Sequence, residues 1–419
     1  MSRFSVSEPE ELLINGGNVE APARVSARAS IVETFKECGL TAALRVDRED
    51  LRRRILIPRR LRAAMAEAMR RKDAEAGVRE AEEAAAAVVE AVSSGLGAWE
   101  DVAPEAPIVV FVNSLSGGRV GPIVKGRLIE LIGNEQVFDL SEIKPSDFVQ
   151  YGLACLEILS DHGDRCAKST RENLRVMVAG GDGTVGWVLG SLGELHQKNR
   201  EPMPPTGIIP LGTGNDLSRS FGWGGSFPFA WKSVLKRCLF KSATGQISHL
   251  DSWHVLISLP DGETIDLPHS LKLTEKGIFS QDGNIEGDSP DQVTCVEGVF
   301  YNYFSVGMDA QVAYGFHHFR EAKPHLAQGP IANKLIYTGY SCAQGWFFTH
   351  CMSDPNLRGL NNILRLSVKK INSSVWEELK YASQCSVRAI VALNLHSYGS
   401  GRNPWGSPKP EYLLKVSFV

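Results

Sequence analysis

Several features that would place this 419-residue chain in a familiar class are missing from it. Its eight cysteines form no C-x-x-C pair, so the spacing gives neither a zinc ribbon nor a disulfide framework, and a reducing cytosol is the simplest setting. No apolar stretch approaches about 18 residues and the N-terminus lacks an apolar signal core, so we expect no membrane-spanning helix. The formal net charge of −3 argues against a general nucleic-acid binder.

The P-loop pattern G-x-x-x-x-G-K-[ST] is also absent, although three glycine-rich turns follow short apolar runs. They read IVVFVNSLSGGR at 108–119, LRVMVAGGDGTVGW at 174–187 and GIIPLGTGNDLSRSFGW at 207–223. Each is predicted to be a strand, a turn and the start of a helix. Three such units predict a parallel sheet whose loops gather at the carboxyl edge, where open α/β sheets bind ligands.

The middle turn contains an acid among its glycines. Glycines let backbone N–H groups approach a phosphate, and the helix predicted to begin near Val185 adds a favourable dipole. Asp182 would repel a phosphate unless a cation lay between them, which predicts a nucleotide bound with Mg²⁺. Three of the glycines also fit the dinucleotide pattern G-x-G-x-x-G, but the ribose-binding acid expected after the next strand, Thr206–Pro210, is missing.

The motifs FVNSLSGG, GGDGT and PLGTGNDLSRSFGWGG together resemble the catalytic region of diacylglycerol kinases, most closely the plant forms without zinc-binding lipid modules. The resemblance continues through LDSW at 250–253, FYNYFSVGMDAQVAYGFHHFR at 300–320 and ALNLHSYGSGRNPWG at 392–406. It implies the fold of phosphofructokinase-like lipid kinases. That fold has an α/β nucleotide domain with an open parallel sheet, a mostly β, sandwich-like accessory domain after it, and the active site between them.

Three parts are expected along the chain. Residues 1–104 form a basic and Ala-rich region, partly disordered with helices; residues 105–247 form the catalytic nucleotide-binding domain; and residues 248–419 form the accessory domain. In the accessory domain we expect strands at 248–258 and 299–306 with a surface loop at 260–292 between them.

The segment 51–72, LRRRILIPRRLRAAMAEAMRRK, has two interpretations. After Pro58, a good first-turn residue, Leu61, Met65 and Met69 recur at helical spacing with arginines around them. The helix either packs this apolar stripe on the kinase domain or lies on a membrane surface that contains anionic lipid.

The reaction that the resemblance implies is transfer of the γ-phosphoryl group of ATP to the primary hydroxyl of 1,2-diacylglycerol, giving phosphatidic acid. We expect Asp182 to contact the metal or to activate that hydroxyl, and both roles remain open. Asp216 is either a helix cap or a metal contact. The expected nucleotide-binding residues are Asn113, Ser116, Gly117, Gly118, Arg119, Gly180, Gly181, Gly183, Thr184, Gly212, Thr213, Gly214, Asn215 and Asp216. Because diacylglycerol lies in a bilayer, we expect a cytoplasmic protein that docks reversibly on a membrane surface.

One departure from the family concerns the C-terminus. Similar members continue past the Asn-Pro-Trp-Gly region through a strand with an acidic Asp-Gly motif, whereas this chain ends with the apolar strand-like segment 412–419. We therefore expect an accessory domain truncated at its C-terminus. The alternatives to an active diacylglycerol kinase are a nucleotide- and lipid-binding isoform with little or no activity, and a kinase for a sphingoid base or NAD.

Overall fold

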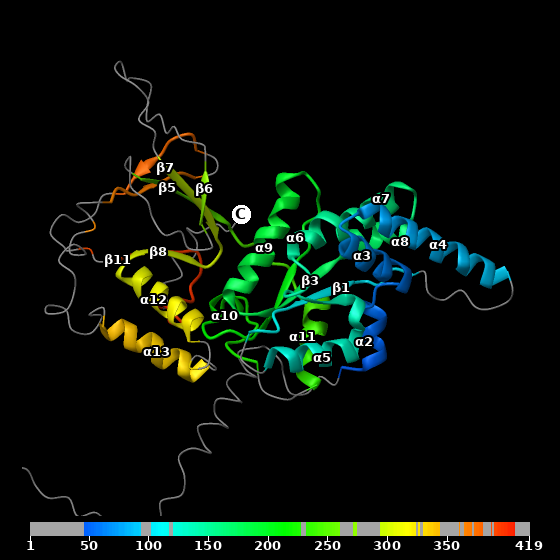
Figure 1. The fold of residues 1–419 in the computed structure, drawn as a ribbon, viewed down its shortest axis with the longest axis horizontal. Helices are drawn as coiled ribbons and strands as arrows, with labels where there is room; N and C mark the ends of the chain where they lie inside the picture. The colour runs from blue at the N-terminus through cyan, green and yellow to red at the C-terminus, as the bar shows by residue number, and fades with distance from the viewer. Residues whose placement is uncertain are drawn as a thin grey trace, which may run out of the picture.

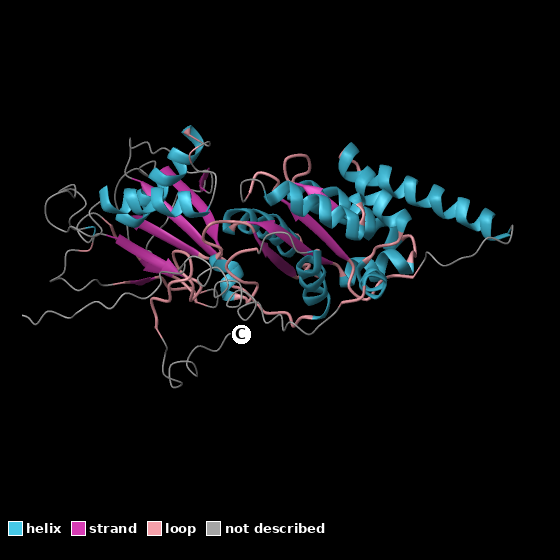
Figure 2. Ribbon diagram, turned by 90° about the horizontal axis from the view of Figure 1, so that it is seen from below, coloured by secondary structure: helices cyan, strands magenta, loops and turns pink. Residues whose placement is uncertain are grey.

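The computed structural model describes residues 46–93, 102–116, 120–227, 232–259, 271–274, 294–323, 326, 330–343, 360, 364–370, 373–379, 387 and 389–406. These residues form two lobes that lie side by side (Figure 1). One lobe is a sheet between layers of helices, and the other contains small sheets with helices beside them, as Figure 2 shows. The predicted phosphate contacts Gly117, Gly118 and Arg119 and the C-terminal segment 412–419 lie outside the described residues.

A four-stranded parallel sheet forms the centre of the first lobe. Its strands are β1 (Ile108–Val112), β2 (Val137–Asp139), β3 (Arg175–Gly180) and β4 (Thr206–Pro210). Their order is β2-β1-β3-β4. Strands buried on both faces read as continuous apolar runs, which is why IVVFV and RVMVAG were recognisable. The prediction of an α/β lobe with a parallel sheet is confirmed, and β2 is an addition to it.

Helices cover both faces of this sheet because successive side chains of a strand point to opposite sides. Val109 and Phe111 of β1 pack against one helical layer, whereas Ile108 and Val110 pack against the other. The first layer contains α3 (Arg59–Arg71), α4 (Ala74–Ser93), α7 (Leu153–Asp161), α8 (Arg165–Asn173) and α9 (Asp182–Gln197). The second contains α2 (Arg48–Ile55), α5 (Val120–Ile132) and α11 (Lys232–Thr244).

The apolar stripe of the arginine-rich segment lies in this core. Leu61 and Met65 of α3 are fully buried, and Met69 is 3% exposed. Arg60 forms an ion pair with Asp164 at the start of α8. The stripe therefore packs on the domain, as the first interpretation of this segment holds.

Two features of the N-terminal helices were not predicted from the sequence. Pro58 is the N-cap residue of α3 and not part of its first turn. The Ala/Glu-rich helix α4 buries Val78 and Ala81, because small residues let it approach α3 closely.

The second lobe consists of antiparallel pairs and two further helices, α12 (Met308–Ala322) and α13 (Pro330–Ala343). One sheet has the order β5-β7-β6, with β5 (Trp253–Leu259), β6 (Leu271–Thr274) and β7 (Thr294–Phe300). The other pairs are β8 (Tyr303–Gly307) with β11 (Ala389–Leu393), and β9 (Ser367–Val368) with β10 (Glu377–Glu378). Antiparallel sheets after the parallel one confirm the predicted accessory region.

Local boundaries in this lobe correct the sequence prediction. The loop expected at 260–292 contains β6, a four-residue strand too short to stand out in a polar segment. The strand expected at 299–306 is two strands, because the chain bends at 301–302 and leaves one sheet for another. The strand expected from 248 begins at Trp253, since its hydrogen-bonded pairing with Phe300 starts there.

Candidate active site

The carboxyl ends of β1 and β3 meet where the strand order reverses, with β2 beside β1 and β4 beside β3. The two loops that follow are joined by Asn113, whose backbone N–H donates to the Ala179 carbonyl (2.9 Å) and whose Nδ2 donates to Oγ1 of Thr184 (3.0 Å). Open α/β sheets bind ligands at such a switch point. Asn113 thus shapes the edge through protein contacts.

Helix α9 begins at Asp182, and its N-terminus is open. Its N-cap residue Gly181 forms no side-chain cap. The N–H groups of the first turn, at Asp182, Gly183 and Thr184, have no partner inside the helix. A Cβ placed on Gly183 would meet nothing within 4 Å. This helix N-terminus offers donors, a positive dipole end and space.

The Asp182 side chain points toward the neighbouring short helix α10 (Asp216–Ser220). Its Oδ2 accepts the Asp216 N–H (2.9 Å) and its Oδ1 accepts the Leu217 N–H (2.9 Å). Burial raises the pKa of the Asp182 carboxyl, against the lowering effect of these two hydrogen bonds, and the Asp216 carboxylate raises it further. Asp182 therefore fills the N-terminus of α10, so of these two helices it is α9 whose N-terminus is open to an anion.

The loop before α10 is held in place by the side chain of Asn215. Asn215 is 1% exposed; its Oδ1 accepts the Gly212 N–H (3.0 Å), and its Nδ2 donates to the carbonyls of Gly212 (2.8 Å) and Gly225 (2.9 Å). A Cβ on Gly212 would lie 2.5 Å from Cα of Gly181. Gly181 and Gly212 are thus required for contact between the two loops, whatever binds above them.

Asp216 connects the two lobes through its carboxylate. Its carboxylate is 2% exposed and accepts hydrogen bonds from Oγ of Ser397 (2.7 Å) and from the N–H groups of Ser400 (3.1 Å) and Gly401 (2.9 Å). It does not cap α10, because Asn215 is the N-cap residue. The turn that binds Asp216 follows β11 in the accessory lobe.

A polar cluster lies behind that turn. The Tyr398 hydroxyl donates to Asp309, which is 2% exposed near the start of α12. The Tyr398 ring contacts that of Tyr303 with centroids 5.0 Å apart. Burial raises the pKa of Tyr303 and Tyr398 and raises that of Tyr337 to about 12, so all three hydroxyls stay protonated near neutral pH. Asp309 and Tyr398 thus form a hydrogen-bonded pair behind the turn that binds Asp216.

Sequence reasoning missed a charged cluster at the end of β2. Asp139 is 4% exposed and accepts from Nζ of Lys125 (2.8 Å) and from the hydroxyls of Ser114 (3.0 Å) and Ser141 (2.8 Å). Burial alone would raise the pKa of Asp139, but these hydrogen bonds outweigh it and lower the pKa to about 2. A single Asp at the end of a three-residue strand forms no sequence pattern by which this cluster could be predicted.

Arg219 of α10 was also missed. Its Nε donates to the Gly214 carbonyl (3.1 Å), and a Cβ on Gly401 of the accessory turn would lie 3.1 Å from its Nη1. The guanidinium thus lies between the glycine loop and the accessory lobe.

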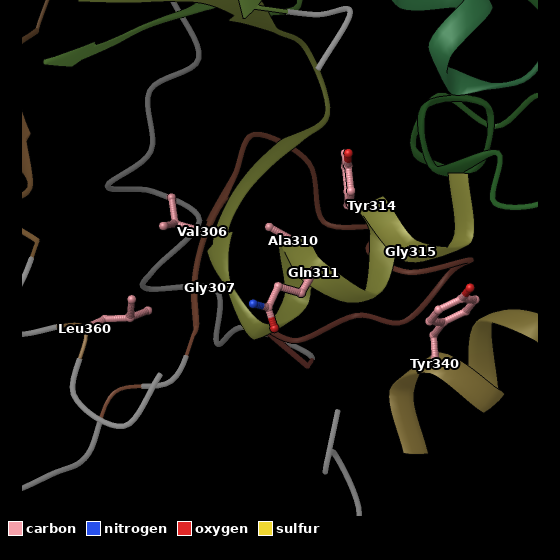
Figure 3. Close-up of a pocket in the computed structure, with 8 residues that line it drawn as sticks. All are labelled: Val306, Gly307, Ala310, Gln311, Tyr314, Gly315, Tyr340 and Leu360. Carbon is pink, nitrogen blue, oxygen red and sulfur yellow. The ribbon is translucent and has the colours of Figure 1, made fainter. Parts of the chain in front are cut away.

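The accessory lobe contains a cavity of about 640 Å³. It is bounded by the end of β8, one face of α12, α13 and Leu360, with Val306 and Leu360 on one side and Tyr314 and Tyr340 on the other (Figure 3). None of the expected site residues lines it. Its apolar walls suit a hydrocarbon group.

In the ranges that the structure covers, no group of three or more His, Cys, Asp or Glu side chains is placed to hold a metal ion. No helix in those ranges is both long and apolar enough to cross a bilayer.

Comparison with known proteins gives matches over most of the chain. Residues 107–247 match the family described as diacylglycerol kinase catalytic domain, and residues 299–418 match the diacylglycerol kinase accessory domain. Diacylglycerol kinase 4 of Arabidopsis thaliana is 54% identical over 402 residues, which cover 95% of this chain and 80% of that protein. Diacylglycerol kinase 7 of the same plant is 53% identical over 95% of this chain and 79% of its own length. Human diacylglycerol kinase iota is 33% identical over 72% of this chain and 24% of its own length.

Proposed function

This chain belongs to the diacylglycerol kinases and uses ATP to phosphorylate diacylglycerol, and we propose that the reaction takes place where Asp182 lies between the open N-terminus of α9 and the glycine loop before α10. The observation that carries this proposal is the contrast between the two helices. The N-terminus of α10 is occupied by Asp182, whereas that of α9 is uncapped.

The phosphates of ATP are assigned to α9. Gly183 and Thr184 present first-turn N–H groups, and nothing stands within 4 Å of a Cβ at Gly183. Backbone donors and the helix dipole together favour an anion there. Thr213 and Gly214 of the neighbouring loop and Ser116 after β1 border the same edge of the sheet. Among the residues expected at the nucleotide, we propose that Gly180, Gly181 and Gly212 determine the shape of the loops. Asn113 and Asn215 are proposed to hold these loops in place.

The residues present fit a Mg²⁺ ion that arrives with ATP. Mg²⁺ in nucleotide sites is held by one or two carboxylates together with the phosphates and water, so a cage of three side chains is not required. Each oxygen of Asp182 uses one acceptor site for α10 and keeps another. When bound, the cation would neutralise negative charge on the transferring phosphoryl group.

Asp182 also suits the role of orienting the attacking hydroxyl. Phosphoryl transfer asks mainly for positioning and charge stabilisation. The two N–H groups of α10 fix the carboxylate in one orientation, and its raised pKa makes it a better proton acceptor than an ordinary Asp. Asp216 holds the accessory turn against this site, so the lobe that we assign to lipid binding meets the lobe that we assign to nucleotide binding at the reacting groups.

Diacylglycerol is proposed to enter from the accessory lobe while the protein is docked on a membrane surface. The cavity beside α12 is a candidate for one acyl chain because its wall is linked to the site. Gly307 and Ala310 in its wall lie on either side of Asp309 in the sequence, and Asp309 accepts a hydrogen bond from Tyr398. Tyr398 belongs to the turn that binds Asp216. This division assigns residues 105–247 to nucleotide binding and 248–419 to lipid binding, with α2 and α3 serving as structural parts of the first lobe.

Fewer arginines of the segment 51–72 can contact anionic lipid than its composition indicates. Arg52 and Arg60 are engaged with protein acceptors. Arg53 pairs with Asp50, and Arg70 and Arg71 pair with Glu67, but these three side chains remain 78%, 68% and 59% exposed. The lipid contact is assigned to these three because a surface ion pair is weak and can be exchanged for an anionic headgroup. Sedimentation with anionic vesicles should fall when they are replaced by Gln, and should fade for the wild type as salt rises through the screening range. Equal binding of both proteins at low salt would contradict the assignment.

The proposed site is tested by nucleotide binding with and without Mg²⁺. We expect Mg²⁺ to strengthen ATP binding to the wild type, and Asp182→Ala to lose that strengthening while it keeps the Mg²⁺-independent affinity. Glu194→Gln on α9 is the matched control, because the Glu194 carboxylate is 42% exposed and pairs with Lys198, four residues along the same helix. An unchanged Mg²⁺ effect in Asp182→Ala would contradict the placement of the metal. The relatives do not favour the sphingoid-base, NAD or inactive-isoform alternatives, since each relative reported above is a diacylglycerol kinase.

A further inference from the structure

Asn333 of α13 reaches from the accessory lobe into the glycine loop of the first lobe. Its Nδ2 donates to Oγ1 of Thr213 (3.1 Å), 120 residues earlier in the chain. The residue is 9% exposed, and its Oδ1 is buried without a hydrogen-bond partner. A buried polar atom without a partner costs roughly 1–3 kcal/mol, so such an atom in a native fold calls for an explanation.

The position of this unpaired oxygen points to a substrate. Thr213 precedes Gly214, and a Cβ on Gly214 would lie 3.3 Å from Oδ2 of Asp182 and 3.2 Å from Oδ2 of Asp216. The contact between Asn333 and Thr213 therefore lies beside the group that we place at the reaction. A side chain at Gly214 would meet both carboxylates, so the loop itself supplies no side chain that could pair with Oδ1 at this position.

The chemistry of an amide oxygen narrows the class of ligand. Oδ1 accepts hydrogen bonds and donates none. Phosphate oxygens at neutral pH are acceptors too, so they cannot satisfy it. A hydroxyl can donate to it, and the reaction brings two kinds of alcohol to this site, the primary hydroxyl of diacylglycerol and the hydroxyls of the ATP ribose.

We propose that Asn333 is a substrate-binding residue whose Oδ1 accepts a hydrogen bond from an alcohol of the bound substrates, with the diacylglycerol hydroxyl as its partner, while its Nδ2 keeps Thr213 in place. The inference rests on the proposed function for the location of the reaction. In this arrangement α13 aligns the attacking hydroxyl from the lipid side, opposite the carboxylate of Asp182. Loss of the hydrogen bond would weaken use of the lipid more than binding of the nucleotide.

The test compares Asn333→Leu with Thr213→Val in the full chain. Asn333→Leu removes both hydrogen bonds of the amide, whereas Thr213→Val removes the bond within the protein and leaves Oδ1 of Asn333 in place. Because Thr213 also borders the proposed nucleotide site, the two variants are compared in their use of the lipid at saturating ATP. Leu335→Ala is the matched control, since Leu335 lies on the same helix and is 69% exposed. Steady-state rates are measured with dioctanoylglycerol and ATP, and ATP affinity is measured without lipid. Melting temperatures verify folding, and Asn333→Ala replaces the Leu variant if that protein does not fold.

We expect kcat/KM for dioctanoylglycerol to be about tenfold lower in Asn333→Leu than in Thr213→Val, which is the scale of one lost hydrogen bond. The ATP affinity of Asn333→Leu should stay within about twofold of wild type. The ribose is the alternative source of the hydroxyl. In that case ATP affinity would fall instead, and wild type but not Asn333→Leu would discriminate ATP from 2′-deoxy- or 3′-deoxy-ATP. Such a result would keep the alcohol contact and overturn its assignment to the lipid.

Equal losses in Asn333→Leu and Thr213→Val, with no change in discrimination between hydroxyl and deoxy substrates, would overturn the inference altogether. Asn333 would then act only through Thr213. This outcome is distinct from failure of the proposed function, which would appear as a wild-type protein that does not phosphorylate dioctanoylglycerol.

Discussion

Replacement of Asp182 by Asn separates the two roles that the structure gives this residue. The carboxylate accepts one N–H from Asp216 and one from Leu217, through different oxygens. An Asn side chain has a single oxygen, so one of the two N–H groups would face an NH₂ donor. Loss of a hydrogen bond to a charged group costs about 1.5–3 kcal/mol, and part of it is offset because repulsion from the Asp216 carboxylate disappears. We therefore expect a loss of about 1–2 kcal/mol in the free energy of unfolding.

The effect on catalysis should be larger than the effect on stability. Removal of one preorganised electrostatic group at a reacting centre lowers kcat by about 10²-fold or more, or about 2.7 kcal/mol of transition-state stabilisation. A charge is required here whether the carboxylate contacts a metal or accepts the hydroxyl proton. The variant should therefore remain folded at the assay temperature and be nearly inactive.

Urea unfolding and the diacylglycerol kinase rate are measured on the same preparations, beside Glu194→Gln as the control on α9. The Glu194–Lys198 pair is exposed, so its loss should change stability by less than about 0.5 kcal/mol and leave the rate unchanged. An Asp182→Asn protein that keeps more than about half of the wild-type rate would refute the role assigned to Asp182. Unchanged stability would refute the capping of α10.

Three further results are expected. Gly183→Ala should raise the KM for ATP without lowering the melting temperature, because a Cβ there meets no protein atom within 4 Å. Gly212→Ala should lower the melting temperature, because its Cβ would lie 2.5 Å from the backbone of Gly181. The reverse pattern in thermal melts and kinetics would contradict this account. Asp139→Asn should lose about 2 kcal/mol of stability at neutral pH. The stabilisation by the Asp139 carboxylate is complete above its unfolded pKa near 3.8 and disappears as the pH falls through about 2. The free energies of unfolding of variant and wild type are compared by urea titration at pH 7 and pH 2. An equal difference between the two proteins at both pH values would count against the ion pair with Lys125. Met65→Ala should cost about 2–5 kcal/mol, and a loss below about 0.5 kcal/mol would show that α3 is not part of the core.

The sheet was predictable because its strands carry local signals. A strand buried on both faces needs an unbroken apolar run, and each of β1, β3 and β4 ends in a glycine turn, so the parallel arrangement and the location of the ligand edge followed from the sequence. The strand Thr206–Pro210 was predicted with the bounds that the structure shows. By contrast β2 has three residues and β6 has four, too few for periodicity to register.

The partners of the site residues could not be predicted, since they depend on contacts between distant segments. The sequence predicts Gly212 as a phosphate contact but gives no sign that two loops touch at this residue, where a side chain would not fit. Asp216 followed a helix-capping pattern, yet its carboxylate binds a turn 181–185 residues later. Asn333 is one amide in an ordinary amphipathic helix, and only the fold brings it to Thr213.

The central claim is that this chain transfers phosphate from ATP to diacylglycerol at Asp182. The most direct test is incubation of the protein with γ-labelled ATP and Mg²⁺ in mixed micelles that contain diacylglycerol, sphingosine and ceramide together, followed by separation of the labelled lipids. The account predicts label in phosphatidic acid alone, and loss of that label with Asp182→Asn. Label in sphingosine phosphate or ceramide phosphate, or equal labelling of phosphatidic acid by the variant, would contradict it.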